Sequence, residues 1–338
     1  MAEFHGWATH GPGQKLDLYS FDPGPLGSEE VEIAVEYCGL CHVDLSIVNN
    51  DLAMSQYPVI PGHEAVGKIV DMDGRIKGLK IGQRVGVAWK ADRCMQCHVW
   101  MTGNNNLCTK ALPPIVGLQG GFADRVRAHR KCTIPLPDAL DIASAGTLLC
   151  SGITVFSPLV TFGIKPTDRI GIVGTGCLGN LGLKFANAWG CEVTAFTSHE
   201  SKPDEAKESG AHHVVSNSDS GVMQKIASSL DMLMVTINTP LDWEVLVKTL
   251  KPNGRLHVLS AVLEPMPIPA IDLTFGQKNV SSLPTCGTAT METMLDFAAR
   301  HNIALQVEHF PMSKVNEAIE HLAAGKARNP IIFDADFV

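Results

Sequence analysis

The chain has 338 residues, of which 45% are hydrophobic and 18% charged, so it is long enough for two domains with buried cores, which argues against extended disorder. A formal net charge of −8 and a pI near 5.9 leave no basic excess for binding nucleic acid or an anionic membrane. Neither a secretory signal nor a membrane-spanning apolar run is found, so we expect a cytoplasmic protein that acts on a small molecule.

Residues 1–150 predict a β-rich, barrel-like domain. Short strand-like runs lie between glycine and proline turns, and over 30–36 apolar residues alternate with glutamates. Such alternation is typical of a strand with one buried face.

From about Asp168 the pattern changes to strand, glycine turn and helix. Strands that alternate with helices predict a doubly wound parallel sheet, that is, an α/β Rossmann domain beside the β-rich domain. The predicted strands are 169–173, 192–196, 232–237, 255–260 and, in the tail, 330–333. The predicted helices are 178–189, 243–250, 291–301 and 314–324, with a turn at Pro252-Asn253-Gly254.

A dinucleotide fingerprint, Gly174-Thr175-Gly176-Cys177-Leu178-Gly179, joins the first predicted strand of this second domain to its first helix. Gly174 allows the tight turn, Gly176 lets backbone amides approach a pyrophosphate, and Gly179 lets helix and sheet pack closely. The strand before the motif and the helix after it favour nucleotide binding over an ordinary turn.

The end of the next strand indicates which nicotinamide cofactor is bound. A site that prefers NAD carries Asp or Glu there to hold the ribose hydroxyls, but this chain has Thr197 and Ser198. Their hydroxyls and Lys202 suit a 2′-phosphate, although Glu200 in the same loop works against one. We therefore expect NADP(H).

Three soft metal ligands are spread along the chain. Cys41 and His63 each follow a strand-like run, and Cys150 is the third candidate. A single buried Cys or His is usually structural, but together these three would form the Cys₂His set of an open catalytic zinc site.

The sequence resembles the medium-chain zinc alcohol dehydrogenases over nearly its whole length, most closely the branch of the cinnamyl alcohol dehydrogenases. The motifs that carry the resemblance occur in the family's order, at residues 39–44, 62–67, 82–85, 120–123, 150–155 and 174–179.

The resemblance implies that Cys41, His63 and Cys150 bind catalytic zinc, with water, substrate oxygen or transiently Glu64 in the fourth position. It also implies that Asp44 orients His63 from behind. An alcohol and aldehyde pair would be the substrate, and the nicotinamide would carry the hydride.

The family's fold implies a GroES-like catalytic domain of residues 1–152, to which 288–338 return, and a Rossmann domain of 153–287. His42 would approach the cofactor pyrophosphate, Thr154 and Thr236 would lie along the cofactor, and the backbone near Cys286 and Thr288 would face the nicotinamide. A homodimer or homotetramer is implied as well.

The sequence departs from the family at a second group of cysteines. Cys94, Cys97 and Cys108 would be ligands of a structural zinc, but Trp100 stands where the family has a further Cys. Either a replacement ligand such as His98 completes the set, or the lobe holds no metal and Trp100 packs it.

A second departure concerns the proton relay. Where the family usually has Ser or Thr, this chain has Val43, and Ser46 stands where the relay's His often lies. A cofactor-binding protein that has lost efficient catalysis is therefore the alternative to an aldehyde reductase or alcohol dehydrogenase. A zinc-free quinone reductase is disfavoured by the metal ligands.

Two further groups of residues are expected to pack in the core or to line a pocket, without a chemical role. Five further cysteines fit buried core positions, namely Cys38, Cys132, Cys177, Cys191 and Cys286. Three apolar residues are candidates for the wall of a substrate pocket, namely Trp89, Leu107 and Ile115. Which aldehyde or alcohol is used does not follow from them.

Overall fold

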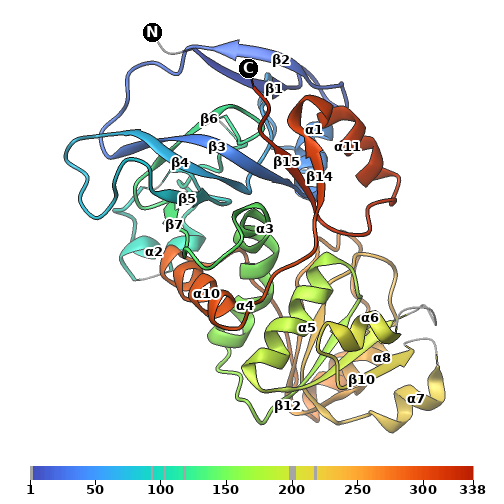
Figure 1. The fold of residues 1–338 in the computed structure, drawn as a ribbon. Helices are drawn as coiled ribbons and strands as arrows, with labels where there is room; N and C mark the ends of the chain where they lie inside the picture. The colour runs from blue at the N-terminus through green and yellow to red at the C-terminus, as the bar shows by residue number, and fades with distance from the viewer. Residues whose placement is uncertain are drawn as a thin grey trace. The chain divides into compact units, whose positions relative to one another are not determined.

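The computed structural model divides the chain into two compact units, Met1–Cys150 with Thr285–Val338, and Ser151–Pro284. The residues it describes are 3–92, 94–102, 104–116, 119–197, 203–216 and 219–337. Both expected fold types are present, one in each unit (Figure 1).

The first unit is built on a seven-stranded sheet in the order β14-β15-β3-β4-β5-β7, with β6 paired to β3. A separate hairpin, β1 with β2, lies outside this sheet. The strands are β1 (Phe4–Ala8), β2 (Asp17–Phe21), β3 (Glu30–Leu40), β4 (Ala65–Met72), β5 (Arg84–Val87), β6 (Arg125–His129), β7 (Thr133–Pro135), β14 (Glu308–Pro311) and β15 (Ile331–Asp334). The helices are α1 (His42–Asn49), α2 (His98–Met101), α3 (Ile142–Thr147), α10 (Thr288–Arg300) and α11 (Val315–Ala323), with short 3₁₀ turns η1 (Asn105–Leu107) and η3 (Met312–Lys314).

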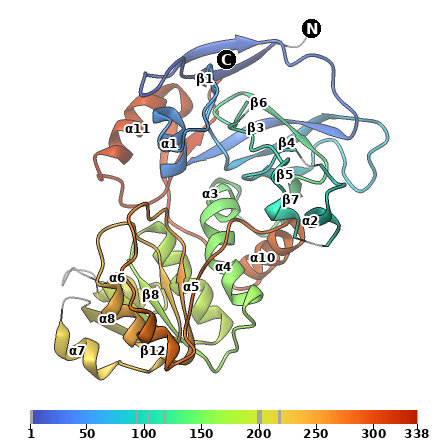
Figure 2. The same ribbon diagram turned by 180° about the vertical axis from the view of Figure 1, so that it is seen from behind.

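The C-terminal segment returns to this unit as part of its sheet. β15 pairs antiparallel with β3, so that Ile331 lies opposite Leu40, and β14 pairs parallel with β15. Both ends of the chain thus share one core, which includes Val31 and Phe333. Helices α1 and α11 lie side by side against it (Figures 1 and 2).

The second unit has six parallel strands in the order β10-β9-β8-β11-β12-β13, which is the strand order of a dinucleotide-binding Rossmann sheet. The strands are β8 (Arg169–Val173), β9 (Glu192–Thr197), β10 (His213–Ser216), β11 (Leu230–Val235), β12 (Leu250–Val258) and β13 (Asn279–Ser282). The helices are α4 (Ile153–Thr161), α5 (Cys177–Trp189), α6 (Pro203–Glu208), α7 (Ser220–Lys225), α8 (Trp243–Lys248) and α9 (Ala270–Thr274).

Two local predictions differ from the structure. The Pro252-Asn253-Gly254 segment lies inside β12 rather than between a helix and a strand, and the pairing with β11 shifts register there. His63 does not follow a strand but precedes β4 by two residues, because the segment before it makes only an isolated bridge at Val59.

One continuous helical stretch, Ile142–Thr161, is long and apolar enough to cross a membrane by length and composition. Its middle is a π-helical turn, η2 (Leu148–Gly152). The most apolar window of the stretch is 78% buried inside the structure. The protein therefore already covers most of this surface, as in the core helix of a globular fold.

Candidate catalytic metal site

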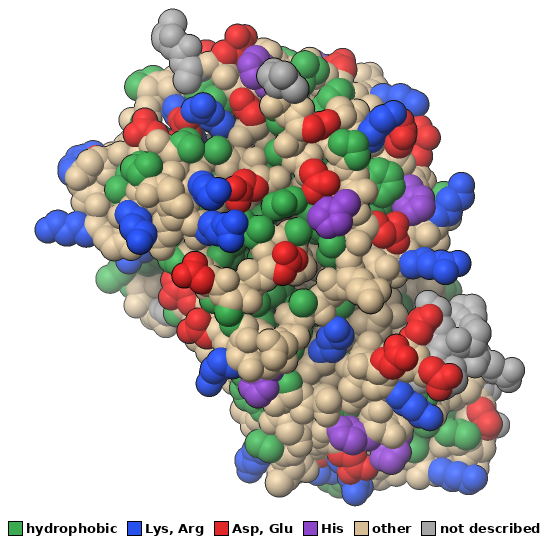
Figure 3. All heavy atoms as spheres, viewed as in Figure 1, with side chains coloured by type: hydrophobic (Ala, Val, Ile, Leu, Met, Phe, Trp, Pro, Cys, Tyr) green, Lys and Arg blue, Asp and Glu red, His purple; other side chains and the backbone are tan. Residues whose placement is uncertain are grey.

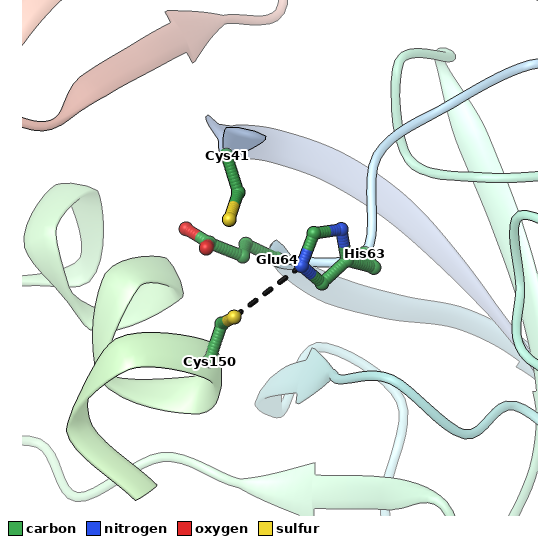
Figure 4. A group of neighbouring side chains, drawn as sticks. All are labelled: Cys41, His63, Glu64 and Cys150. Atoms are coloured by element: carbon green, nitrogen blue, oxygen red, sulfur yellow. Dashed lines mark hydrogen bonds between the residues drawn. The ribbon is translucent and has the colours of Figure 1, made fainter. Parts of the chain in front are cut away.

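Four side chains from three separate segments meet in the first unit: Cys41, His63, Glu64 and Cys150. Cys41 directly follows β3 and precedes α1, the His-Glu pair precedes β4, and Cys150 lies on η2. One ligand atom of each lies within 4.8 Å of all the others. Figure 4 shows the two sulfur atoms, the His63 ring and the Glu64 side chain converging on a common centre.

The Asp44 carboxylate holds this arrangement from behind and is itself fully buried. Its Oδ1 lies 3.0 Å from His63 Nδ1, and its Oδ2 accepts a hydrogen bond of 3.0 Å from the backbone N–H of Cys41. Because Nδ1–H donates to Asp44, the lone pair of the ring belongs to Nε2, which faces Cys150 Sγ at 3.3 Å. The carboxylate thus holds the His63 ring in an orientation that turns Nε2 toward the cluster.

Gly62 is a part of the site that the sequence reading did not single out. Its backbone N–H donates to Asp44 Oδ1 at 2.9 Å. Its φ is +100°, and a Cβ there would lie 2.7 Å from the backbone N of Phe122. The signal was present in the Gly62-His63-Glu64 motif, where only the last two residues were given a role.

Burial and the charges of neighbouring groups shift the pKa of every side chain in the cluster. A hydrogen bond with the Cys150 thiol holds the pKa of Cys41 well below its usual range, and the same contact raises the pKa of Cys150. Burial alone would lower the pKa of His63, but the nearby Asp44 charge has the larger effect together with the hydrogen bonds of the ring, so the pKa is raised. Burial, reinforced by the Cys41 charge, raises the pKa of Glu64 to about 8.

This donor set fits zinc. Two thiols, an imidazole nitrogen and a carboxylate are ligands that Zn²⁺ takes, and three protein ligands with one exchangeable position characterise catalytic zinc sites. Buried anionic groups are costly without a compensating charge, which a bound cation would supply.

An apolar wall lies beside the cluster. The Trp89 ring meets His63 edge to face at 5.4 Å and packs, together with Val43, against the buried Ile47 and Ile115. Ile115 is completely buried, so it supports this wall from within and does not line an accessible pocket. Leu107 is about half exposed. Trp89 is the candidate for the pocket wall whose ring contacts a residue of the cluster.

The glycine fingerprint lies in the second unit, between β8 and α5. Gly174 has φ +99°, and a Cβ on it would lie 2.4 Å from Ile237 Cγ2. A Cβ on Gly179 would lie 2.0 Å from the carbonyl oxygen of Gly174, whereas one on Gly176 would meet no heavy atom within 4 Å. Two glycines are thus required by packing, and the third leaves open space at the start of α5, where a pyrophosphate could approach.

The remaining candidate cofactor residues are distributed as follows. Thr175 belongs to the turn, and Cys177 and Leu178 open α5. Thr197 ends β9, Thr154 lies on α4, and Thr236 follows β11 and donates to the Val173 carbonyl at 2.8 Å. His42 is the exposed first residue of α1 in the other unit. Ser198, Glu200 and Lys202 lie outside the described residues.

The second cysteine group also comes together. Cys94, Cys97 and Cys108 have their sulfur atoms within 4.8 Å of one another. Among the described residues, no His, Asp or Glu joins them, so His98 does not supply a fourth ligand. The Trp100 backbone N–H instead donates to Cys97 Sγ at 3.4 Å.

The other five cysteines divide into two groups. Cys38, Cys132 and Cys191 are buried, as expected of small core residues. Cys177 and Cys286 are partly exposed, so the core interpretation was wrong for them. Cys177 is the first residue of α5, and Cys286 lies in the loop before α10, so neither is enclosed within the interior of an element.

We expect Asp44→Asn to weaken zinc binding about 10 to 100-fold, because an amide removes the charge that orients and polarises His63. Competition with a chelator would measure the affinity. Asp71→Asn is the matched control, since this carboxylate is exposed on β4 outside the cluster. Equal zinc affinity of the Asp44 variant and the wild type would show that this carboxylate has no role in metal binding.

Comparison with known proteins places these features in one family. The profile of the alcohol dehydrogenase GroES-like domain matches residues 27–138, and that of the zinc-binding dehydrogenase domain matches residues 177–300. The chain is 45% identical to the aldehyde reductase AdhA of Synechocystis sp., over 94% of this chain and 95% of that protein. It is 33% identical to a probable cinnamyl alcohol dehydrogenase of Arabidopsis thaliana, over 98% and 94%.

Solved structures agree with this placement. A cinnamyl alcohol dehydrogenase from Sorghum bicolor superposes with a TM-score of 0.93 at 33% identity, covering 98% of both chains. A cinnamyl alcohol dehydrogenase from Helicobacter pylori, solved with NADP(H), superposes with a TM-score of 0.88 at 26% identity, again covering 98% of both. The chain therefore belongs to the zinc-type alcohol dehydrogenase family, with a GroES-like domain and a Rossmann-type dehydrogenase domain.

Proposed function

We propose that this protein is a zinc-dependent aldehyde reductase or alcohol dehydrogenase that transfers a hydride between NADP(H) and an alcohol/aldehyde pair. The observation that carries the proposal is the buried cluster of Cys41, His63, Glu64 and Cys150, with Asp44 behind it. The similarity to an aldehyde reductase at 45% identity supports the same reaction.

In this proposal the zinc would be held by Cys41, His63 and Cys150, with Glu64 able to exchange as a fourth ligand. When bound, zinc supplies a Lewis acid for the substrate oxygen, and the nicotinamide supplies the hydride. Asp44 fixes the His63 tautomer and ring orientation. Trp89 covers the His63 ring and excludes water from that side.

A cofactor-binding protein of the same fold with weak catalysis is the second candidate. The observation in its favour is Val43, which packs beside Trp89 in the apolar wall and has no hydroxyl to pass a proton. The donor cluster argues against it, because a binding protein has no use for a buried, open metal site. The same donors argue against a zinc-free quinone reductase.

A preference for NADPH over NADH is expected, from Thr197 at the end of β9 and from Ser198 and Lys202 in the sequence that follows it. Charged hydrogen bonds to a 2′-phosphate are worth roughly 1.5 to 3 kcal/mol each, enough for a preference of about tenfold or more in kcat/KM. The measurement is a panel of aromatic and aliphatic aldehydes with the two cofactors in parallel, and Lys202→Ala should reduce the ratio. Equal or better turnover with NADH would contradict the proposal and point to Glu200 as a ribose ligand.

We also propose a cytoplasmic homodimer or homotetramer without nucleic acid or membrane partners. Acidic and basic side chains are interspersed over the face shown in Figure 3 and gather into no basic patch. An association through the Rossmann sheet would use its edge strand β13, near which Phe275 is 86% exposed.

A further inference from the structure

The thiol lobe, which we define as the described residues between Ala91 and Leu112, holds three cysteine sulfurs where a structural zinc would need four protein ligands. Cys94, Cys97 and Cys108 are the only His, Cys, Asp or Glu residues of this group in the described part of the chain. The residues present therefore do not fit a closed tetrahedral zinc site.

Two of these sulfurs are close enough to react with each other. Cys94 Sγ lies 3.1 Å from Cys108 Sγ, whereas Cys97 Sγ lies 3.6 Å from it. A disulfide bond is about 2.05 Å long, so the closer pair needs to approach by only about 1 Å. Of these two pairs, Cys94 and Cys108 are therefore the better placed dithiol, because their sulfurs lie closer together.

We propose that Cys94 and Cys108 form a reversible redox site, which small-molecule disulfides such as oxidised glutathione convert into an intramolecular disulfide. In the oxidised protein, this disulfide and not a structural metal ion links the two sides of the lobe.

The exposure of the two thiols assigns their order of reaction. Cys94 is partly exposed and can meet a dissolved disulfide, whereas Cys108 is only 2% exposed. Cys94 Sγ, as thiolate, attacks one sulfur of oxidised glutathione, which forms a mixed disulfide and releases one glutathione thiolate. Cys108 Sγ, as thiolate, then attacks Cys94 Sγ and expels the second glutathione. The two protein thiols lose two protons and two electrons, and one oxidised glutathione becomes two molecules of reduced glutathione.

The proposed disulfide would join two parts of a loop whose base is already closed by backbone hydrogen bonds. The backbone N–H groups of Ala91 and Asp92 both donate to the Leu112 carbonyl, at 3.0 and 3.3 Å, and so close the base of the lobe. Away from this base, the sulfur of Cys108 contacts those of Cys94 and Cys97, and Cys97 Sγ also accepts from the Trp100 backbone N–H. A covalent bond between Cys94 and Cys108 would fix the segment between them, and cross-linking such a loop restricts mainly its open states.

The test uses the purified full-length protein with its catalytic zinc bound, treated with oxidised glutathione and denatured under acid. Intact mass should fall by two hydrogen atoms and return on reduction, and peptide mapping without reductant should join Cys94 to Cys108. Cys97→Ser should still form this disulfide, whereas Cys108→Ser should lower the rate of intramolecular disulfide formation at least about tenfold. Cys191→Ser, which alters a buried thiol of the second unit, is the matched control.

Three results would overturn the proposal. The first is a wild-type protein that gains only glutathione adducts or does not change in mass. The second is a disulfide that joins another pair, such as Cys94 with Cys97. The third is a purified protein with two zinc ions per chain whose lobe thiols resist oxidation, which would mean that the lobe recruits a fourth ligand. The mapping in the wild type decides between them even if Cys108→Ser does not fold.

Discussion

Cys150→Ser is expected to remove most of the catalytic zinc and nearly all turnover while leaving the fold intact. Cys150 sits on the π-helical turn η2 and faces His63 Nε2 at 3.3 Å, so a hydroxyl there replaces one of two thiolate ligands by a poor one. Loss of the Lewis acid removes several kcal/mol of transition-state stabilisation, or roughly a thousandfold in rate. Elemental analysis and NADPH-dependent aldehyde reduction measure the two effects.

Cys191→Ser is the matched control for this substitution. Cys191 is buried in the second unit, and burial raises the pKa of its thiol to about 12, so it is an inert core residue. Its Sγ lies 3.4 Å from the Lys165 carbonyl oxygen, to which a serine hydroxyl can also donate. This variant should keep zinc and activity. Full zinc content together with full turnover in Cys150→Ser would show that the metal assignment is wrong.

The second unit was well predicted from sequence because its signals are local. The apolar run of β8, the three glycines and the apolar length of α5 lie within about two dozen residues. Gly174 and Gly179 answer steric demands that the structure shows, such as the 2.0 Å approach of a Gly179 Cβ to the Gly174 carbonyl, and Gly176 leaves open space at the start of α5. Where tertiary pairing overrides a local signal, as in β12 across Pro252-Asn253-Gly254, the prediction was wrong.

The metal cluster shows what local patterns cannot supply. Cys41, His63 and Cys150 were selected through resemblance to a family, because no periodicity relates residues so far apart. What brings them together is the pairing of β3 with β4, which aligns Cys38 with Ala65, and the π-helical turn at Cys150. A π-helical turn has no sequence signature strong enough to be predicted, and such turns are frequently found at functional sites.

The parallel pair of β14 and β15 was only half predicted, since the strand near 330–333 was expected and β14 was not. β14 has only four residues, one of them Pro311, and its burial alternates weakly. The strand forms because β15 already pairs with β3 and offers a free edge. Such short edge strands depend on tertiary context more than on their own sequence.

Val43→Ser and Val43→Thr are expected to accelerate alcohol oxidation, because an alcohol must lose its hydroxyl proton before a hydride can leave its carbon. Val43 lies between Cys41 and Asp44 and packs in the apolar wall with Trp89, so the natural chain has no hydroxyl at that point. Positioned proton transfer usually contributes about 10² to 10⁴-fold, and a restored hydroxyl should recover part of that factor. Turnover in both directions on one alcohol and aldehyde pair is the measurement.

Val43→Ala separates the hydroxyl from the space that a smaller side chain creates. Threonine keeps the shape of valine, so a gain in Val43→Thr that Val43→Ala lacks must come from the hydroxyl, whereas a gain shared by both comes from a wider pocket beside Trp89. If neither hydroxyl-bearing variant gains in either direction between about pH 6 and 9, another route already carries the proton, such as water or Ser46 acting through water. A large gain would mean that the natural protein either uses a substrate that supplies its own proton path or catalyses alcohol oxidation inefficiently.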